Sequence, residues 1–410
     1  MDNFTMYVSL FVFWYPLVMS TVWIIGGILF YHRREKKPGV PLTETPMVSI
    51  LIPCYNEEDT IENTIEQLNE LNYPNYEIIT INDGSKDMTE LILENLSKKY
   101  KKLRVIQLKT NTGKANALYL GLIASKGEFL VGLDADAYLD VDALSYMIPH
   151  FITPHYGERV GAVTGNPRVR NRSSLLARIQ LCEFSSIISL IKRTQRLLGK
   201  VMTVSGVVVM FRKRALIDCG LWDRDLITED IGVTWKLQKR FWDIRYEPRA
   251  ICWMLVPETI VGLWKQRVRW AQGGLEVIMR HWDIFLDWRY RRLLPVYIEQ
   301  IFSIFWAIAW SILFIITIIQ IITGKQTFFP MFWQGQYLSL LCLVQFVVAM
   351  SLDKRYDEKL LKYYLWAIWY PIFYWYFNAL VILRAIPKTL FRDKRKKFAI
   401  WDSPDRGISI

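Results

Sequence analysis

Apolar residues follow two patterns along this chain. In the first, the apolar runs are long and almost unbroken, and each of the segments 6–31, 295–323, 328–352 and 361–386 is long enough to span a bilayer as a helix. In the second, which begins at Val48, short apolar runs alternate with amphipathic stretches, as in a parallel sheet with crossover helices. The chain is therefore expected to combine membrane-spanning helices with an α/β domain.

The α/β part predicts a specific order of elements. The predicted strands are residues 48–53, 77–81, 103–108 and 129–133, and the predicted helices are 57–71, 87–100 and 114–124. A further strand is predicted at 204–207 and a further helix from 227 to about 241. Ligands of such open sheets bind outside the carboxyl ends of the strands, so the residues that follow each strand are candidates for a site.

Polar clusters follow three of these strands. They are residues 54–58, residues 82–85, and the run from Asp134 to Asp136. Carboxylates one residue apart at a strand end can hold a divalent cation and leave coordination positions open for a diphosphate. Aspartate is also common in turns, so this interpretation depends on the convergence of all three clusters at one edge of the sheet.

Several positions near these clusters have two interpretations each. Asp83 could accept a hydrogen bond from a base or a ribose, or cap the following helix together with Ser85. Lys114, which opens a predicted helix, could bind an anion or lie in solvent. Residues 161–172 form a turn-rich basic segment that suits an anionic or hydroxyl-rich ligand, or a basic surface loop.

The second half of the chain adds further candidates. Asp230 lies in the first turn of a predicted helix, where it could cap the helix or act as a general base toward a hydroxyl. Gln266 and Arg269 share one face if their segment is helical, and Trp270 follows them. The arginine could grip a diphosphate and the tryptophan could stack on a sugar ring. A basic amphipathic helix in the membrane interface is the alternative, and both interpretations can hold together.

Charge and composition narrow the class of protein. The chain has 410 residues, is 52% hydrophobic and carries a formal net charge of +12. Its basic runs, residues 32–37 and 392–397, directly flank apolar segments. This placement indicates that the positive charge interacts with anionic lipid and not with nucleic acid. The five cysteines form no C-x-x-C pair and the histidines share no metal-binding spacing, so a reducing, cytoplasmic setting is expected.

The pattern leaves the membrane topology in conflict. An N-terminus outside, a cytoplasmic domain and three further crossings put the C-terminus outside, whereas the basic run at 392–397 favours the inside. Pro371 breaks the last segment, so residues 361–386 are the first candidate for a re-entrant path. We favour an inside C-terminus.

Taken in order, the motifs resemble those of a known family. They are Asn-Asp-Gly-Ser at 82–85, Asp-Ala-Asp at 134–136, Thr-Glu-Asp at 228–230 and Gln-Arg-Val-Arg-Trp at 266–270. This series, bracketed by apolar segments, is similar to that of the processive, membrane-embedded family 2 glycosyltransferases, which include cellulose, chitin and hyaluronan synthases. Residues 162–168, 262–274 and 401–407 resemble the bacterial biofilm poly-β-1,6-N-acetylglucosamine synthases within that family.

The resemblance implies a fold and a reaction. The fold is α/β, a family 2 glycosyltransferase-type nucleotide-sugar-binding fold with a mixed, mainly parallel sheet, plus transmembrane and interfacial α-helices. The reaction is inverting, processive transfer of N-acetylglucosamine from UDP-N-acetylglucosamine to a growing β-1,6-linked chain, with Mg²⁺ or Mn²⁺ as cofactor. Export across the bacterial cytoplasmic membrane for the biofilm matrix, and a small membrane accessory subunit, are also implied.

The resemblance also assigns roles to residues. It makes Asp230 the catalytic base and Asp134 and Asp136 the metal ligands. Nucleotide binding is assigned to Tyr55, Glu57, Asp83, Lys114, Asp134, Gln266 and Arg269. Acceptor binding is assigned to Asn166, Arg168, Ser205, Gly206, Glu229 and Trp270. Gating over the bound nucleotide is assigned to Trp401, Ser403, Asp405 and Arg406.

The expected domain order follows from the same resemblance. It runs from an N-terminal transmembrane anchor (1–34) through a cytoplasmic glycosyltransferase domain (45–255), interfacial amphipathic helices (256–294) and transmembrane channel segments (295–387) to a basic C-terminal tail (388–410). Three alternatives stay open. They are a hyaluronan-, chitin- or cellulose-type synthase, a single-transfer polyprenyl-phosphate glycosyltransferase, and a nucleotide-binding membrane scaffold or transporter subunit that would tolerate Asp230→Asn.

Overall fold

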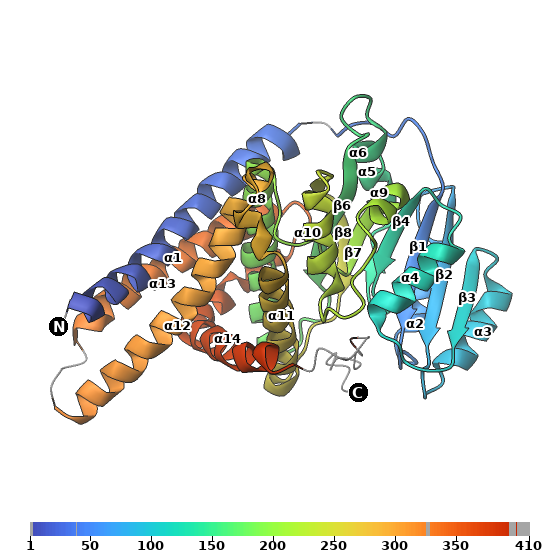
Figure 1. Ribbon diagram of the computed structural model, residues 1–410. Helices are drawn as coiled ribbons and strands as arrows, with labels where there is room; N and C mark the ends of the chain where they lie inside the picture. The colour runs from blue at the N-terminus through green and yellow to red at the C-terminus, as the bar shows by residue number, and fades with distance from the viewer. Residues whose placement is uncertain (1–2, 38, 325–328, 393–398, 400–410) are drawn as a thin grey trace.

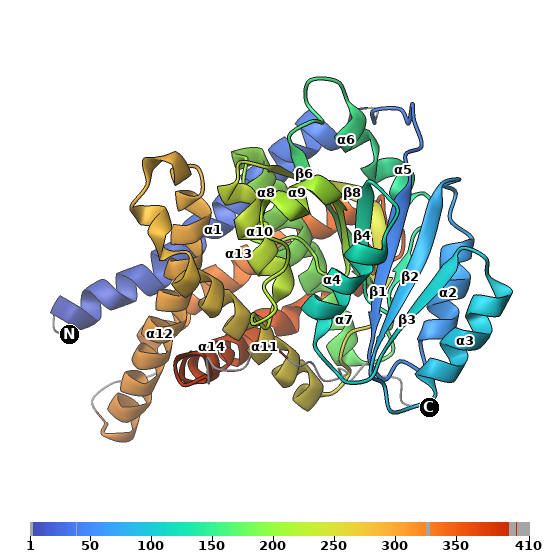
Figure 2. The same ribbon diagram turned by 45° about the vertical axis from the view of Figure 1, so that its right-hand side comes forward.

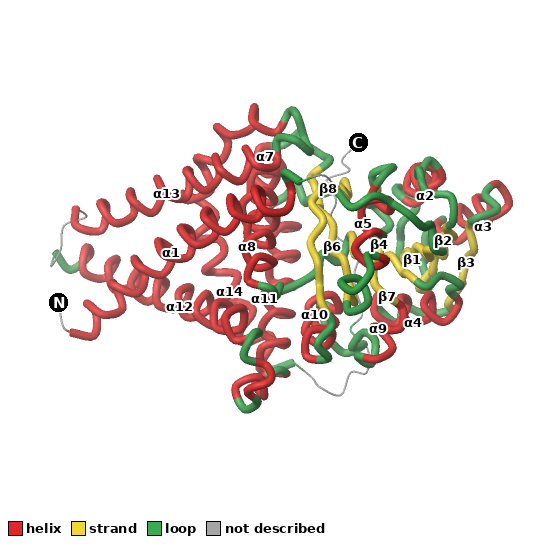
Figure 3. The backbone as a smooth tube through the Cα atoms, turned by 90° about the horizontal axis from the view of Figure 1, so that it is seen from above, coloured by secondary structure: helices red, strands yellow, loops and turns green. Residues whose placement is uncertain are grey.

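Long helices gather at one end of the molecule and a twisted sheet lies at the other (Figure 1). The computed structural model describes residues 3–37, 39–324, 329–392 and 399, with residues 329–334 and 372 described through their backbone alone. Seen from above, the strands lie toward one end of the long axis with short helices around them, and the longest helices lie toward the other end (Figure 3). The division into a helical part and an α/β part, predicted from the two apolar patterns, is therefore confirmed.

The α/β part is built on one mixed, eight-stranded sheet. Its strands are β1 (Val48–Cys54), β2 (Tyr76–Asp83), β3 (Leu103–Leu108), β4 (Phe129–Leu133), β5 (Tyr138–Leu139), β6 (Val160–Val169), β7 (Val208–Arg212) and β8 (Asp243–Met254). They lie in the order β3-β2-β1-β4-β7-β6-β8-β5. The first four pair in parallel, β7 runs antiparallel to both β4 and β6, and β8 returns parallel to β6. This is the mixed sheet that the family resemblance predicts.

The α/β part carries nine of the described helices. They are α2 (Ile61–Asn69), α3 (Thr89–Lys99), α4 (Lys114–Ala124), α5 (Ala143–Met147), α6 (Pro149–Ile152), α7 (Leu175–Glu183), α8 (Ile191–Leu198), α9 (Lys213–Asp218) and α10 (Glu229–Lys239). A π-helical segment, η2 (Phe184–Leu190), joins α7 to α8. Figure 2 shows α2 and α3 on one side of β1 to β3 and α4 on the other.

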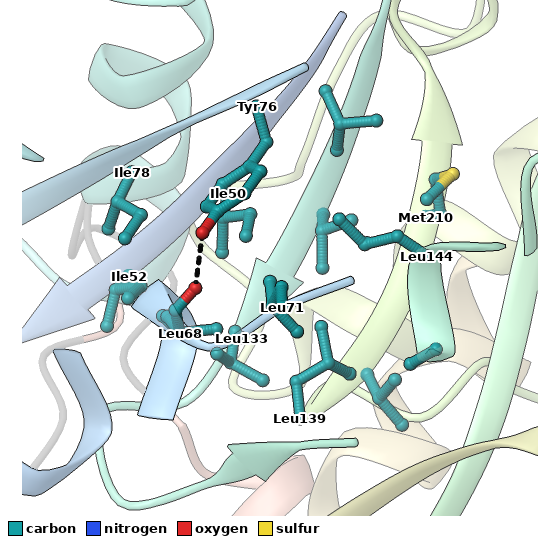
Figure 4. Packing of buried hydrophobic residues seen from close by; sticks show 14 of the residues in the cluster. Ile50, Ile52, Leu68, Leu71, Tyr76, Ile78, Leu133, Leu139, Leu144 and Met210 are labelled. Atoms are coloured by element: carbon teal, nitrogen blue, oxygen red, sulfur yellow. Dashed lines mark hydrogen bonds between the residues drawn. The ribbon is translucent and has the colours of Figure 1, made fainter. Parts of the chain in front are cut away.

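Alternate residues of the central strands supply the two halves of the core. Ile50 and Ile52 of β1 pack with α2, α3 and α5, whereas Leu51 faces the opposite side and packs with α4. All seven residues of β1 are buried because helices cover both faces of the sheet. Figure 4 shows the first of these clusters, in which the Tyr76 hydroxyl also donates to the Leu68 carbonyl at 2.7 Å.

Two segments differ from what the sequence predicts. Residues 161–172 were expected to form turns, but most of them belong to β6, which is buried along its whole length between β7 and β8. Residues 204–207 were expected to form a strand, but they make a turn that leads into β7. Val208 N donates to Ser205 O at 3.0 Å across this turn. Sheet neighbours that are distant in sequence decide the first outcome, and the local bond between Val208 and Ser205 decides the second.

The helical part contains α1 (Asn3–Phe30), α11 (Ile260–Arg280), α12 (Leu294–Ile322), α13 (Phe329–Asp353) and α14 (Trp375–Leu390). Among the described residues, three helical segments are long and apolar enough to cross a membrane, and they are Asn3–Glu35, Leu294–Ile322 and Gly335–Asp353. The first of them ends in the π-helical turn η1 (Tyr31–Glu35). Short 3-10 helices η3 (Trp282–Phe285) and η4 (Trp288–Tyr290) connect α11 to α12.

The fourth expected spanning segment is not a continuous helix. Residues 361–386 instead pass through a 3-10 helix, η5 (Leu360–Ile368), and a π-helical turn, η6 (Tyr370–Tyr374), before α14 begins. Pro371 lies in η6 and has no N–H to donate to the preceding turn, which accounts for the break. Among the described residues, this segment is therefore not one of the continuous helices long enough to cross a membrane, and its re-entrant path stays a prediction.

Buried ion pairs join the helical part to the α/β part. Arg193 on α8 donates to Glu35 Oε1 at the end of η1 at 2.5 Å. It also pairs with Asp353 Oδ1 at the end of α13 at 2.8 Å. Arg168 on β6 reaches Asp353 Oδ2 at 2.7 Å. These four residues, the Glu35–Arg193–Asp353–Arg168 network, fix α8 between two long apolar helices and the sheet.

The end of the described chain returns to the α/β part. Arg392, just past α14, pairs with Glu276 Oε1 on α11 at 2.6 Å. Ala399 N donates to Arg224 O at 2.8 Å in the loop that precedes α10. Residue 399 therefore lies on the same side of the long apolar helices as the sheet.

Candidate active site

The loop after β4 holds two carboxylates at the carboxyl edge of the sheet. Thr64 Oγ1 of α2 donates to the carbonyl of Ala135 at 2.7 Å, and Ala137 N donates to Asp134 O at 3.1 Å. These bonds fix the loop, so that Asp134 is partly exposed and Asp136 is buried. These contacts therefore fix the backbone from which both side chains project.

Asp83 at the end of β2 organises the neighbouring loop. Its carboxylate accepts hydrogen bonds from Thr112 N at 2.8 Å, Thr112 Oγ1 at 2.8 Å and Gly113 N at 2.7 Å. Gly113 has a φ of +89°, a conformation that other residues rarely adopt, and α4 starts directly after it. Asp83 therefore holds the loop from which Lys114 projects, and it does not cap the helix that follows β2.

Lys114 links the two halves of the site. Its ammonium lies 2.5 Å from Asp134 Oδ1 and 3.2 Å from Glu229 Oε1 at the start of α10. Burial alone lowers the pKa of Lys114, but the carboxylates of Asp134 and Glu229 outweigh it and raise the pKa above the ordinary value. The lysine is therefore a permanent cation, and the solvated alternative is excluded.

Asp230 is the second acidic residue of α10 and lies in a setting that weakens it as an anion. Burial and the charge of Glu229 raise its pKa, while Lys114, the N–H of Ile231 and Arg269 lower it. The balance raises the pKa of Asp230 to about 6. A carboxylate with this pKa is ionised at neutral pH and is a stronger proton acceptor than an ordinary aspartate.

Helix α11 brings the Gln-x-x-Arg-Trp residues to the same place. Its start is capped by Thr259, whose side chain accepts from Gly262 N at 3.0 Å. The guanidinium of Arg267 lies 4.6 Å from the ring centroid of Trp270, and Glu183 on α7 holds it through bonds of 2.6 and 3.1 Å. Trp270 is therefore backed by a fixed, buried cation.

One cavity of about 640 Å³ collects most of these side chains. Of the residues predicted from the sequence, those lining it are Lys114, Asp134, Asp136, Ser205, Gly206, Glu229, Asp230, Gln266, Arg269 and Trp270. The cavity continues between α1, α12 and α13, where Tyr15, Trp306 and Gln345 are among its lining residues. Gln266 Oε1 is buried there without a hydrogen-bond partner among the described residues, so a ligand could supply a donor.

Five predicted residues lie outside this cavity. Tyr55, Glu57 and Asp83 belong to the strand ends beside it, and Glu57 accepts from Thr60 Oγ1 at 2.8 Å at the start of α2. The acceptor-binding prediction for Asn166 and Arg168 is not supported. The Asn166 amide donates to Pro248 O at 3.0 Å within the sheet, and Arg168 is engaged by Asp353. The predicted gating residues Trp401, Ser403, Asp405 and Arg406 lie outside the described part of the chain.

Sequence reasoning missed two charged residues at this site. Lys192 on α8 lines the cavity, and Glu183 holds Arg267 from behind. Glu183 is the only charged residue between 179 and 191, which is a signal of a buried polar group, whereas Lys192 is followed by Arg193 in a polar helix and carries no such signal. Their partners are distant in sequence, so the pattern alone names none of them.

The donor set at the strand end fits a divalent cation. Asp134 and Asp136 offer hard carboxylate oxygens, and the described residues contain no group of three or more potential metal ligands. A cation held here would therefore keep positions for ligand oxygens. Burial, together with the charges of Asp134 and Asp136, raises the pKa of the nearby Cys252 thiol, as expected where the local field favours cations.

Comparison with known proteins gives the same assignment. The profile of the family described as Glycosyl transferase family 2 matches residues 49–220. A poly-beta-1,6-N-acetyl-D-glucosamine synthase of Staphylococcus epidermidis is 43% identical over 98% of this chain and 99% of its own. A protein of the same name from Staphylococcus aureus strain MSSA476 is 45% identical over 97% of this chain and 98% of its own.

A solved structure supports the fold. The mannosyltransferase of Pyrobaculum calidifontis, determined in complex with GDP-Man and Mn²⁺, aligns with a TM-score of 0.58 over 93% of this chain and 100% of its own, at 18% identity. The α/β fold, the glycosyltransferase class and the resemblance predicted from the motifs are thus confirmed. The chain belongs to glycosyl transferase family 2 and, within it, to the poly-β-1,6-N-acetyl-D-glucosamine synthases.

Proposed function

We propose that this enzyme transfers N-acetylglucosamine from UDP-N-acetylglucosamine to the end of a growing β-1,6-linked chain and passes that chain through its membrane part. The observation that carries the proposal is the single cavity that joins Asp134, Asp230 and Trp270 to the space between the long apolar helices. The names of the relatives from Staphylococcus support the donor sugar and the linkage.

Asp230 acts as the general base in this proposal. It removes the proton from the C6 hydroxyl of the terminal acceptor sugar while that oxygen bonds to the anomeric carbon of the donor. The bond from the anomeric carbon to the diphosphate breaks, and UDP leaves with the electron pair. One displacement inverts the α-linked donor to a β-linked product. The pKa of about 6 keeps Asp230 ionised at neutral pH, so it is ready to accept the proton.

The leaving nucleotide lies on the side of Lys114 and Arg269. Both cations line the cavity and can bind the diphosphate oxygens, Arg269 in a bidentate manner. Asp134 and Asp136 would hold a divalent cation, Mg²⁺ or Mn²⁺, which would neutralise charge on the departing diphosphate. Asp83 supports this side indirectly, because it holds the loop that presents Lys114.

The acceptor lies on the side of Trp270, where the indole face suits the face of a sugar ring. Trp306 and Gln345 line the cavity where it continues between the long helices, so both an aromatic ring and a polar group are available there to a polysaccharide. The role of a small membrane accessory subunit stays a prediction. A contact of the segment 401–407 with the nucleotide stays one as well.

The proposed membrane placement has three crossings, one for each candidate spanning helix among the described residues. With the N-terminus outside, Asn3–Glu35 leads in, Leu294–Ile322 leads out and Gly335–Asp353 leads back. The α/β part and residue 399 then share the cytoplasmic side, in agreement with the basic flanks and with the bond from Ala399 to Arg224. This arrangement removes the conflict between the segment count and the charge rule.

The deciding experiment uses full-length protein purified in detergent, with UDP-N-acetylglucosamine, UDP-glucose or UDP-glucuronate as donor and with or without a co-expressed small membrane protein. We expect UDP release and a β-1,6-linked polymer from the first donor alone. Linkage analysis showing a β-1,4 or alternating product would overturn the proposed product. Release of one sugar on a polyprenyl phosphate would point to single transfer.

A further inference from the structure

Lys192 is a buried cation that lines the same cavity. It lies on α8, only 5% of the residue is exposed, and it shares the cavity wall with Asp230. Its ammonium donates a hydrogen bond to Ser205 Oγ. Within the described ranges, no carboxylate forms an ion pair with it. Lys114, the other lysine of the cavity wall, has two such partners.

A buried ammonium that makes no direct ion pair needs a reason. It carries three N–H donors, and removing it from water without acceptors is costly. Burial lowers the pKa of Lys192 to about 7, while the charge of Asp230 acts in the opposite direction. Ser205 accounts for one donor. The arrangement is that of a group which completes its hydrogen bonds when a ligand occupies the cavity.

Ser205 places this ammonium next to Asp230. Ser205 N donates to Thr164 Oγ1 at 2.9 Å, which fixes the turn that carries the hydroxyl. The following residue, Gly206, lies against the base, since a Cβ built on it would be 3.0 Å from Asp230 Oδ2. Lys192, Ser205 and Asp230 therefore form one wall of the cavity.

The charged residues on the two sides of this wall differ. On the nucleotide side, Lys114 is bound to Asp134 and Glu229, and Arg269 follows on α11. In the other direction, Gln195 lies one turn after Lys192 on α8 and donates to Glu299 Oε2 on α12 at 3.4 Å. Lys192 thus belongs to the wall that extends from the base toward the long apolar helices.

We propose that Lys192, together with Ser205, binds the terminal sugar of the growing chain and holds its attacking hydroxyl against Asp230. The ligand is a neutral, hydroxyl-rich saccharide, whose oxygens accept the free N–H donors of the ammonium. The diphosphate is excluded as its ligand because Lys114 and Arg269 occupy that side. This inference deepens the proposed function and rests on it.

The test separates acceptor binding from donor binding. Full-length Lys192→Met enzyme is assayed for UDP release with a short β-1,6-linked N-acetylglucosamine oligosaccharide as acceptor, and for slow hydrolysis of the donor without it. Loss of a buried hydrogen bond to the acceptor predicts a rise of about tenfold in the KM for the acceptor. The KM for the donor and the hydrolysis rate are expected to stay within about twofold.

Two further variants keep the test decisive. Arg196→Gln removes a cation from the same helix, where Arg196 pairs with Asp243 at 2.7 Å outside the cavity, and both KM values should stay unchanged. Ser205→Ala removes the fixed hydroxyl and should raise the acceptor KM even if Lys192→Met does not fold. The inference is overturned, and the proposed function is not, if the acceptor KM is unchanged in both cavity variants. The same holds if donor affinity falls as much as acceptor affinity. A wild-type enzyme that turns over no donor overturns the proposed function and this inference with it.

Discussion

At the scale of single residues, the two neighbouring carboxylates at the start of α10 have different surroundings. Glu229 is buried and paired with Lys114, whereas the partly buried Asp230 accepts a side-chain hydrogen bond only from the N–H of Ile231 among the described residues. The same helix start therefore carries one neutralised carboxylate and one that is available for proton transfer. Helix capping does not account for this difference, because it would treat both side chains alike.

Replacement of the base tests its role directly. Asp230→Asn preserves shape but cannot accept the proton, so we expect polymer synthesis to fall about 10²- to 10⁴-fold. Donor affinity, measured by titration calorimetry, should change little. The matched control is Asp225→Asn, which removes an exposed carboxylate that pairs with Arg280 outside the cavity, and it should leave the rate near that of the wild type. Retained synthesis in Asp230→Asn would refute the assignment.

The pH dependence follows from the raised pKa of Asp230. The base works only when deprotonated, so activity should be low well below pH 6, rise through about pH 6 and then level off. Glu229 is a cause of the raised pKa, so Glu229→Gln should move the acidic limb of the pH profile to lower pH. An acidic limb that stays in place or moves upward in Glu229→Gln would contradict this account. Initial rates of UDP release across the pH range provide the measurement.

At the scale of elements, α8 couples the catalytic cavity to the membrane part. Consecutive residues on this helix have different partners, since Lys192 bonds to Ser205 in the cavity wall and Arg193 bonds to Glu35 and Asp353. The Glu35–Arg193–Asp353–Arg168 network therefore fixes the helix that carries Lys192. A shift of α1 or α13 would be transmitted to the cavity through this helix.

Loss of one carboxylate from this network should destabilise the fold. Asp353→Asn leaves Arg193 and Arg168 with fewer counter-charges in a buried place, and breaking a buried pair costs about 3–5 kcal/mol. Thermal unfolding of the detergent-purified protein should therefore occur at a clearly lower temperature. Arg289→Gln, which removes an exposed pair with Asp287, is the control and should unfold like the wild type. If Asp353→Asn unfolded at the same temperature as the wild type, the network would have no structural role.

Elements set by local pattern could be predicted from the sequence, and those set by distant partners could not. The strand 129–133 and the helix 114–124 have the predicted bounds, because apolar runs and a preceding glycine determine them locally. The carboxylates at strand ends were found for the same reason. The ion pair of Arg168 with Asp353 could not be predicted because the two residues are 185 positions apart, and Lys192 was missed because its burial depends on neighbouring elements.

At the scale of the whole molecule, the proposed three crossings predict that the residues after α12 and those after α14 lie on opposite sides of the membrane. Thr323, after α12, and Phe391, after α14, are both exposed. We expect Thr323→Cys to react with a membrane-impermeant maleimide in intact cells, and Phe391→Cys to react only after permeabilisation. Four of the five native cysteines are buried, and the fifth, Cys342, is partly buried within α13, so wild-type protein is the background control. Labelling of both sites from outside would require a fourth crossing.

The buried network has a consequence for how the protein is made. Its members come from the beginning, the middle and the end of the chain, Glu35 on η1, Arg193 on α8 and Asp353 at the end of α13. During synthesis from the N-terminus, Arg193 emerges long before Asp353 does. Until α13 is inserted, the nascent protein carries an excess of positive charge at the junction of its two parts. Insertion of α13 is therefore the step that supplies the missing counter-charge and joins the catalytic domain to the membrane part.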